Sequence, residues 1–273
     1  MVGAVRPTAR LVLLLVLLAG CATPGVPLQP LLAVEEELAE QAGSALPAGM
    51  LLDAVAKVAH APADRAEIAR RRCGLAWAMQ GAEAAIPGCR EAARLGIVAG
   101  GESQHRGLQR LSLVLSAAGQ GAEAQRIAYA LQLPADPLSA AILWWARGLA
   151  LQAQHQSAVM AMRTSRGLLE EAARRDPKRA EFLAIADLRL GEALAEDGEA
   201  VAACVVLRRG IERQRALDAA NPEYAEYRLY LVRLLRALGR LPGEDAARDE
   251  GRRLGAELLA RDPQRAEYLA VVP

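Results

Sequence analysis

Two cysteines have the spacing that a disulfide across a helix hairpin requires. Cys73 and Cys89 lie at equal distances on either side of a Gln-Gly-Ala turn at 80–82. Equal distances from the turn place two residues at one level on antiparallel helices, where the sulfurs can bond if the Cα atoms lie within about 7 Å. The pair is therefore either a disulfide, in an oxidising compartment, or two small buried residues. Cys204 has no partner left, and we expect it in the core.

The other chemistry-bearing side chains form no catalytic or metal-binding set. His60, His105 and His155 are isolated, without cysteine or carboxylate neighbours at zinc-ligand spacing. The Gly-x-Gly-x-x-Ala string at 119–124 follows a helical pattern rather than a strand, so it does not indicate a dinucleotide site. No phosphate loop, nucleophile elbow or acid–base carboxylate pair is present. We predict that the protein is not an enzyme and needs no metal and no cofactor.

Aromatic and arginine side chains are the candidates for contacting a partner. Trp144 and Trp145 point roughly 100° apart on a helix, so at least one should reach a neighbouring hairpin or a groove. Arginines can hold carboxylates by two hydrogen bonds, and aromatic rings supply rigid contact area. The candidate groove residues are Trp144, Trp145, Tyr224, Arg228, Arg233 and Arg236. The alternative for the charged members is an ordinary solvated face.

The N-terminal segment has the layout of a secretory signal. Arg6 and Arg10 precede an unbroken apolar run at 11–18, and two small residues follow it. The run is shorter than the roughly 20 residues that a membrane-spanning helix needs, so we expect no transmembrane anchor.

The residues at 18–21, Leu-Ala-Gly-Cys, resemble the lipobox of bacterial lipoproteins. The resemblance implies that residues 1–20 are removed and that Cys21 carries the acyl chains, such as palmitate, that hold the protein on a membrane. Ala22, where some lipoproteins have an acidic residue, implies sorting to the outer membrane, with the chain on its periplasmic face. Residues 21–30 then form a proline-rich linker. The alternative is an ordinary cleaved signal with a cysteine nearby by chance.

The remainder, 31–273, is repetitive. The segment 175–182 recurs at 261–268, and a related one spans 220–227, each with Ala, Glu and an aromatic residue downstream of a proline. Prolines at 137, 177, 222 and 263 are separated by 40, 45 and 41 residues, and each interval holds two helical patterns. Asp176, Asn221 and Asp262 precede these prolines as N-cap residues, so each Asx-Pro pair is predicted to start a helix. The predicted hairpins are 31–60, 63–96, 102–131, 137–175, 179–219 and 223–260.

The segments 115–131 and 236–263 resemble the tetratricopeptide (TPR) repeat family, with small residues at the turn between two helices. The intervals of 40 to 45 residues are longer than the family's 34, so the helices are lengthened. The resemblance implies an all-α solenoid of tandem antiparallel hairpins with a concave groove that binds proteins.

The composition argues against nucleic acid as a partner. The chain of 273 residues has 33 basic and 32 acidic side chains and a net charge of +1, so it lacks the excess of basic residues that is typical of nucleic-acid-binding proteins. Aromatic residues make up only 3%, too few for stacking bases along a strand.

We therefore expect a lipid-anchored, TPR-like adaptor on the periplasmic face of the outer membrane. Its partners would be one or more envelope proteins of a pilus, secretion or polysaccharide machine. Two alternatives stay open: an enzyme or small-molecule binder with a deep polar pocket within 31–136, near His60 or His105, and a purely structural envelope tether.

Overall fold

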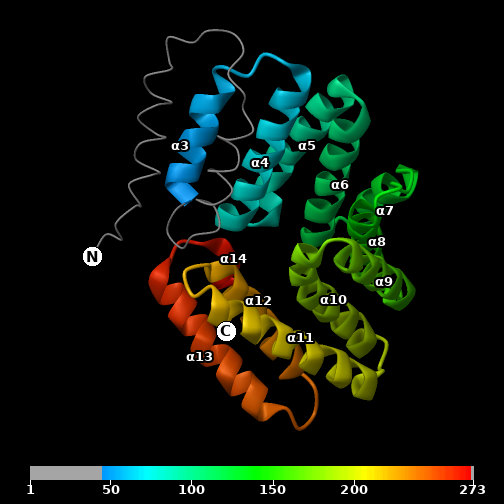
Figure 1. Cartoon of the computed structure of the whole chain (residues 1–273), viewed down its shortest axis with the longest axis vertical. Helices are drawn as coiled ribbons and strands as arrows, with labels where there is room; N and C mark the ends of the chain where they lie inside the picture. Colours follow the sequence, from blue (N-terminus) through cyan, green and yellow to red (C-terminus); the bar gives the residue numbers. More distant parts are fainter. Residues whose placement is uncertain (1–44, 272–273) are drawn as a thin grey trace.

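The structure, a computed structural model, describes residues 45–271, and every regular element in this range is a helix (Figure 1). The helices form consecutive antiparallel hairpins: α4 (Pro62–Gln80) with α5 (Ala82–Ala99), α6 (Gly101–Ala117) with α7 (Gly121–Ala130), α8 (Pro137–Gln152) with α9 (Val159–Arg175), α10 (Phe182–Glu196) with α11 (Ala200–Ala220), and α12 (Ala225–Leu238) with α13 (Asp245–Arg261). Helix α3 (Ala45–Ala56) precedes them, and α14 (Ala266–Leu269) follows. The predicted all-α solenoid is confirmed, and the hairpins predicted from 63 to 260 match. Of the pair predicted at 31–60, residues 31–44 lie outside the described residues.

The prediction that each Asx-Pro pair starts a helix holds at Asp176 and is wrong at Asn221 and Asp262. Asp176 accepts from the Lys178 N–H at 3.1 Å and begins the short 3-10 helix η1 (Pro177–Glu181). Asn221 donates backwards to the Leu217 carbonyl at 3.0 Å, and α12 begins four residues later. Helix α14 likewise begins four residues after Asp262.

These three residues differ from Asp136 because each also ends the preceding helix as its C-cap. At Asp176 and Asn221 φ is −138°, and at Asp262 it is −145°. At Asp136 φ is −72°, the side chain accepts from the Ser139 N–H at 2.8 Å, and α8 begins at once with Pro137.

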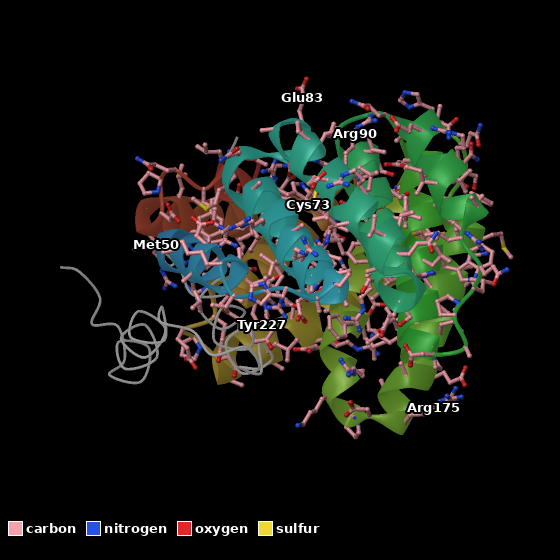
Figure 2. The ribbon with its side chains drawn as sticks, turned by 90° about the horizontal axis from the view of Figure 1, so that it is seen from above. Met50, Cys73, Glu83, Arg90, Arg175 and Tyr227 are labelled. Atoms are coloured by element: carbon pink, nitrogen blue, oxygen red, sulfur yellow. A yellow bond between two sulfur atoms is a disulfide. The ribbon has the colours of Figure 1, made fainter. Side chains whose placement is uncertain are left out.

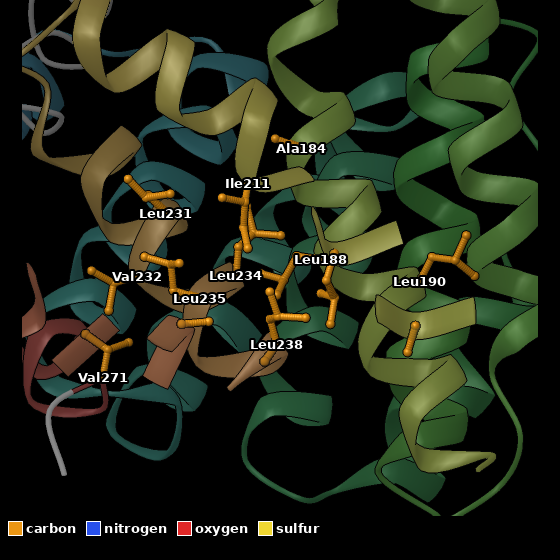
Figure 3. Packing of buried hydrophobic residues seen from close by; sticks show 14 of the residues in the cluster. Ala184, Leu188, Leu190, Ile211, Leu231, Val232, Leu234, Leu235, Leu238 and Val271 are labelled. Carbon is orange, nitrogen blue, oxygen red and sulfur yellow. The ribbon is translucent and has the colours of Figure 1, made fainter. Parts of the chain in front are cut away.

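The largest core cluster lies between α10, α11, α12 and α13. Leu188, Leu234 and Leu238 lie close together in it and are almost completely buried (Figure 3). Gly210 allows α11 to approach this cluster, because a Cβ atom there would lie only 2.7 Å from a Leu234 methyl carbon. With few aromatic rings, the chain fills its core by such close packing of leucine against small residues.

A buried carboxylate ties three consecutive helices together. Asp187 on α10 is 0% exposed and accepts hydrogen bonds from Arg166 of α9 at 2.7 Å, Arg209 of α11 at 2.7 Å and Arg213 of α11 at 2.5 Å. Charge-assisted hydrogen bonds of this kind are stronger than neutral ones. The network fixes the angle at which one hairpin follows the other.

The solenoid turns back on itself. Helix α14, which the chain reaches last, contacts α4 of the first hairpin (Figure 1). Tyr268 on α14 is completely buried, and Val271 is nearly so. The first helices of the hairpins, α4, α6, α8, α10 and α12, therefore surround a central space, which we call the lumen. Among residues 45–271, no helix has both the length and the apolar character needed to cross a membrane.

Candidate functional site

The lumen is an open groove of about 1240 Å³. Its wall is built from α4, α6, α8, α10 and α12, from the loop before α8 and from the segment that follows α13. Among the described residues, five carboxylates line it, and the arginines that line it are Arg70, Arg71, Arg106, Arg110, Arg189, Arg233, Arg236, Arg240 and Arg265. Arginines thus outnumber carboxylates in the lumen, whereas basic and acidic residues nearly balance over the whole chain. Positive charge is therefore concentrated in the lumen.

Arg110, on α6, is the most unusual of these arginines. Within the described range, no carboxylate lies at ion-pair distance from it, whereas its neighbours Arg70 and Arg106 pair with Glu67 and Glu102. Burial and the positive charge of Arg70 lower the pKa of Arg110 to about 10. It is therefore still charged at neutral pH, in a place where a negative group would be stabilised.

Four buried side-chain nitrogen atoms have no hydrogen-bond partner in the described part of the chain: His105 Nε2, Trp145 Nε1, Arg189 Nε and Arg265 Nε. All four residues line the lumen. The tryptophan and arginine nitrogens can only donate. An unpaired buried donor costs about 1 to 3 kcal/mol, so their presence in one place indicates a surface suited to hydrogen-bond acceptors.

The α12 side of the lumen carries four of the arginines, Arg233, Arg236, Arg240 and Arg265, with two of the five carboxylates, Glu226 and Glu267. Arg233 lies 3.5 Å from Glu267, and burial followed by repulsion from Glu267 raises the pKa of Glu226. Burial also raises the pKa of Tyr230, whose phenol interacts with Arg233. Arginines therefore outnumber carboxylates on this side of the lumen as well as toward α4, α6 and α10.

A small apolar cavity of about 30 Å³ opens into the lumen between α8 and α10. Trp145 and Phe182 form part of both walls, and Arg189 lies at the junction, with its Cζ atom 5.7 Å from the Trp145 ring. Met162 and Leu169 of α9 close the cavity from behind. An apolar pocket is thus placed directly beside an arginine that has an unpaired donor.

The structure brings together three of the six predicted groove residues. Trp145, Arg233 and Arg236 line the lumen. Trp144, the other member of the adjacent pair, lies away from it, with its ring 4.9 Å from the guanidinium carbon of Arg147.

Tyr224 and Arg228 also lie away from the lumen. Tyr224 precedes the first turn of α12 and contacts the ring of Tyr227, at 6.0 Å between centroids. Arg228 pairs with Asp218 at 3.0 Å and with Glu257 at 3.4 Å, so it faces α11 and α13. Of the candidates on or next to α12, Arg233 and Arg236 thus line the lumen, whereas Tyr224 and Arg228 do not.

The stripe that faces the lumen is Glu226, Tyr230, Arg233 and Ala237. Its spacing of four, three and four residues is that of one helix face, and this was the available signal. Arg110 carried no comparable signal, because its lack of a partner depends on what packs around it.

The two histidines of the small-molecule alternative are placed differently. His60 is exposed and does not line the lumen, whereas His105 does. Burial lowers the pKa of His105. The polar pocket expected near it is the lumen itself, which extends to α12, well beyond 31–136. The described residues contain no group of three side chains suited to hold a metal.

The three cysteines in the described part of the chain do not line the lumen. Cys73 of α4 and Cys89 of α5 form a disulfide, with Cα atoms 4.9 Å apart and both residues completely buried (Figure 2). Cys204 is only half-buried, and its thiol lies 3.3 Å from Glu244 Oε1, so the expectation of a core residue is wrong. Its place at the edge of the core brings it within reach of this surface carboxylate. Cys21, the signal segment and the linker lie outside the described residues.

Comparison with known proteins finds similar solved structures but no match to a family model or to a curated protein. A crystal structure of kinesin light chain nearly identical TPR-like repeats from Podosopora anserina is similar to it, with 18% sequence identity and a TM-score of 0.44. The match covers 72% of this chain and 97% of that chain.

Proposed function

We propose that this protein is a lipid-anchored adaptor that binds a segment of an envelope protein in its lumen. The observation that carries the proposal is the lumen: a long groove, lined by the first helix of every hairpin, in which buried donors find no acceptor among residues 45–271. Solenoids bind partners along such extended concave surfaces. At about 1240 Å³ the groove exceeds the usual volume of a small-molecule pocket, roughly 300 to 1000 Å³, and suits an extended polypeptide.

The proposed location is the periplasmic face of the outer membrane, in a pilus, secretion or polysaccharide machine. The lipobox-like residues at 18–21 and the apolar run before them support a secreted, acylated protein. The disulfide between Cys73 and Cys89 is also typical of proteins outside the reducing cytoplasm.

Metabolic labelling with palmitate tests the anchor. The wild-type chain is expected to incorporate label and to fractionate with the outer membrane, whereas Cys21→Ala is expected to do neither. Equal labelling of the two proteins would contradict acylation at Cys21.

Photo-crosslinking in living cells tests the adaptor. A photoreactive residue at Arg240, which is exposed and lines the lumen, is expected to capture a discrete envelope protein. The matched control carries the same residue at Val201, which is 82% exposed on α11, a helix that contributes nothing to the lumen. Identical products from both positions, or none from either, would count against binding in the lumen and favour a structural tether.

A further inference from the structure

We infer that the lumen binds an acidic polypeptide segment, with a carboxylate on Arg110 and Arg189 and a neighbouring small aliphatic side chain in the cavity between α8 and α10. This rests on the proposed binding of a partner in the lumen and adds the chemistry of the segment that binds.

Three arginines from three helices converge on one part of the lumen. Arg110 of α6, Arg189 of α10 and Arg233 of α12 all interact electrostatically with the Tyr230 phenol. Arg233 has a carboxylate 3.5 Å away in Glu267, whereas Arg110 has none among the described residues. Arg189 uses Nη1 on Glu192 at 2.9 Å, and its Nε is left without an acceptor. A carboxylate has two oxygen atoms, and each can accept a hydrogen bond from a guanidinium group.

The unpaired donors in the lumen also favour a ligand that carries oxygen atoms as hydrogen-bond acceptors. Trp145 Nε1 and Arg265 Nε are buried in the wall of the same lumen, far apart in the sequence and on different elements. An extended polypeptide presents a carbonyl oxygen at every residue, so it can satisfy donors that lie along a groove.

The apolar cavity favours a polypeptide over another polyanion. It is lined by Leu138, Ile142 and Phe182 beside Trp145, and it opens next to Arg189. Its volume of about 30 Å³ fits the tip of a small aliphatic side chain. An acidic polysaccharide also carries carboxylates, but it has no aliphatic side chain to bury. The combination of an apolar anchor and an adjacent carboxylate is therefore best met by an acidic peptide.

The test measures binding of a fluorescein-labelled peptide of alternating alanine and glutamate to the full chain in detergent, by fluorescence anisotropy. The wild type is expected to bind this peptide, and to bind the alanine–glutamine analogue at least 10-fold more weakly. Hydrogen bonds to charged groups contribute about 1.5 to 3 kcal/mol, so we expect Arg110→Gln to weaken binding by about 10- to 100-fold. The matched control is Arg163→Gln, on the outer helix α9, whose ion pair with Glu199 spans 3.5 Å, and it should bind like the wild type.

The Arg110 variant separates binding from folding. Because Arg110 has no carboxylate partner in the described part of the chain and is repelled by Arg70, Arg110→Gln should unfold at the same urea concentration as the wild type or a higher one. Unchanged peptide affinity in this variant would overturn the inference. Equal affinity for the glutamine analogue, or tighter binding of polygalacturonate than of the peptide, would overturn it as well.

The two proposals fail in different ways. Crosslinking from Arg240 in cells without binding of the acidic peptide would leave the adaptor standing and refute the ligand chemistry. Peptide binding that depends on Arg110, in a chain that takes up no palmitate, would support the ligand chemistry and refute the membrane anchor.

Discussion

Breaking the disulfide between Cys73 and Cys89 should lower the free energy of unfolding by about 3 kcal/mol. The bond joins residues 16 apart in the sequence, and a cross-link that closes a loop of this size removes about 10 cal/mol/K of entropy from the unfolded chain, or about 3 kcal/mol at 25 °C. Helices α4 and α5 pack against each other along their whole length, so the folded hairpin gains little further order from the bond. The disulfide therefore stabilises the protein mainly by lowering the entropy of the unfolded chain.

The assay is equilibrium unfolding in urea. A background with Cys21→Ala and Cys204→Ala leaves Cys73 and Cys89 as the only cysteines of the chain, which prevents exchange with other thiols. Both sulfurs are completely buried, so a phosphine reductant can reach them only as the protein unfolds. Curves with and without reductant compare the same side chains, and a Cys73→Ala/Cys89→Ala chain serves as a second comparison. A shift in the midpoint at constant slope reports the change in stability.

Two results would refute this reasoning. If reduction lowers the free energy of unfolding by less than about 1 kcal/mol, closing the loop does not restrict the unfolded chain as the entropy argument requires. If the oxidised, urea-unfolded chain reacts with two equivalents of a thiol reagent, the bond itself is absent.

The remaining predictions concern buried charge and close packing. Asp187→Asn should destabilise the protein by about 3 kcal/mol in urea unfolding, because it leaves three guanidinium groups without their carboxylate. Burial acts to raise the pKa of Glu67, but its hydrogen bonds and ion pairs with two arginines prevail and lower the pKa to about 2. Its stabilisation, on the order of 3 kcal/mol, is therefore present above pH 4.5 and lost as the pH falls toward 2, so the gap in unfolding free energy between the wild type and Glu67→Gln should close over that interval. Gly239→Ala should cost about 1 to 3 kcal/mol by thermal or urea unfolding, because the new Cβ atom would lie 2.7 Å from the backbone of Arg248. The control Gly167→Ala, with nothing within 4 Å and a helical backbone, should gain about 1 kcal/mol, and equal effects of the two substitutions would contradict the packing argument.

The helices and their turns could be read from the sequence because the signals for them are local. The spacing of apolar residues in 102–131 and 137–175 predicts two helices each, and Gly119 with φ of +76° is found at the turn of the first. Cys73 and Cys89 could be predicted to lie opposite each other for the same reason, because each is an equal number of residues from the turn. The rule that an Asx-Pro pair starts a helix failed at Asn221, because the Asn221 side chain donates to the end of the preceding helix, α11.

The site depends on distances that no local pattern contains. Only the sum of small rotations between five successive hairpins decides that α14 reaches α4 and that the inner helices enclose a lumen. The same rotations decide that Trp145 rather than Trp144 faces the lumen. They also decide that, within 45–271, Arg228 pairs with a carboxylate and Arg110 does not. Helical periodicity determines which residues share a face, but the packing of the other hairpins determines what that face meets.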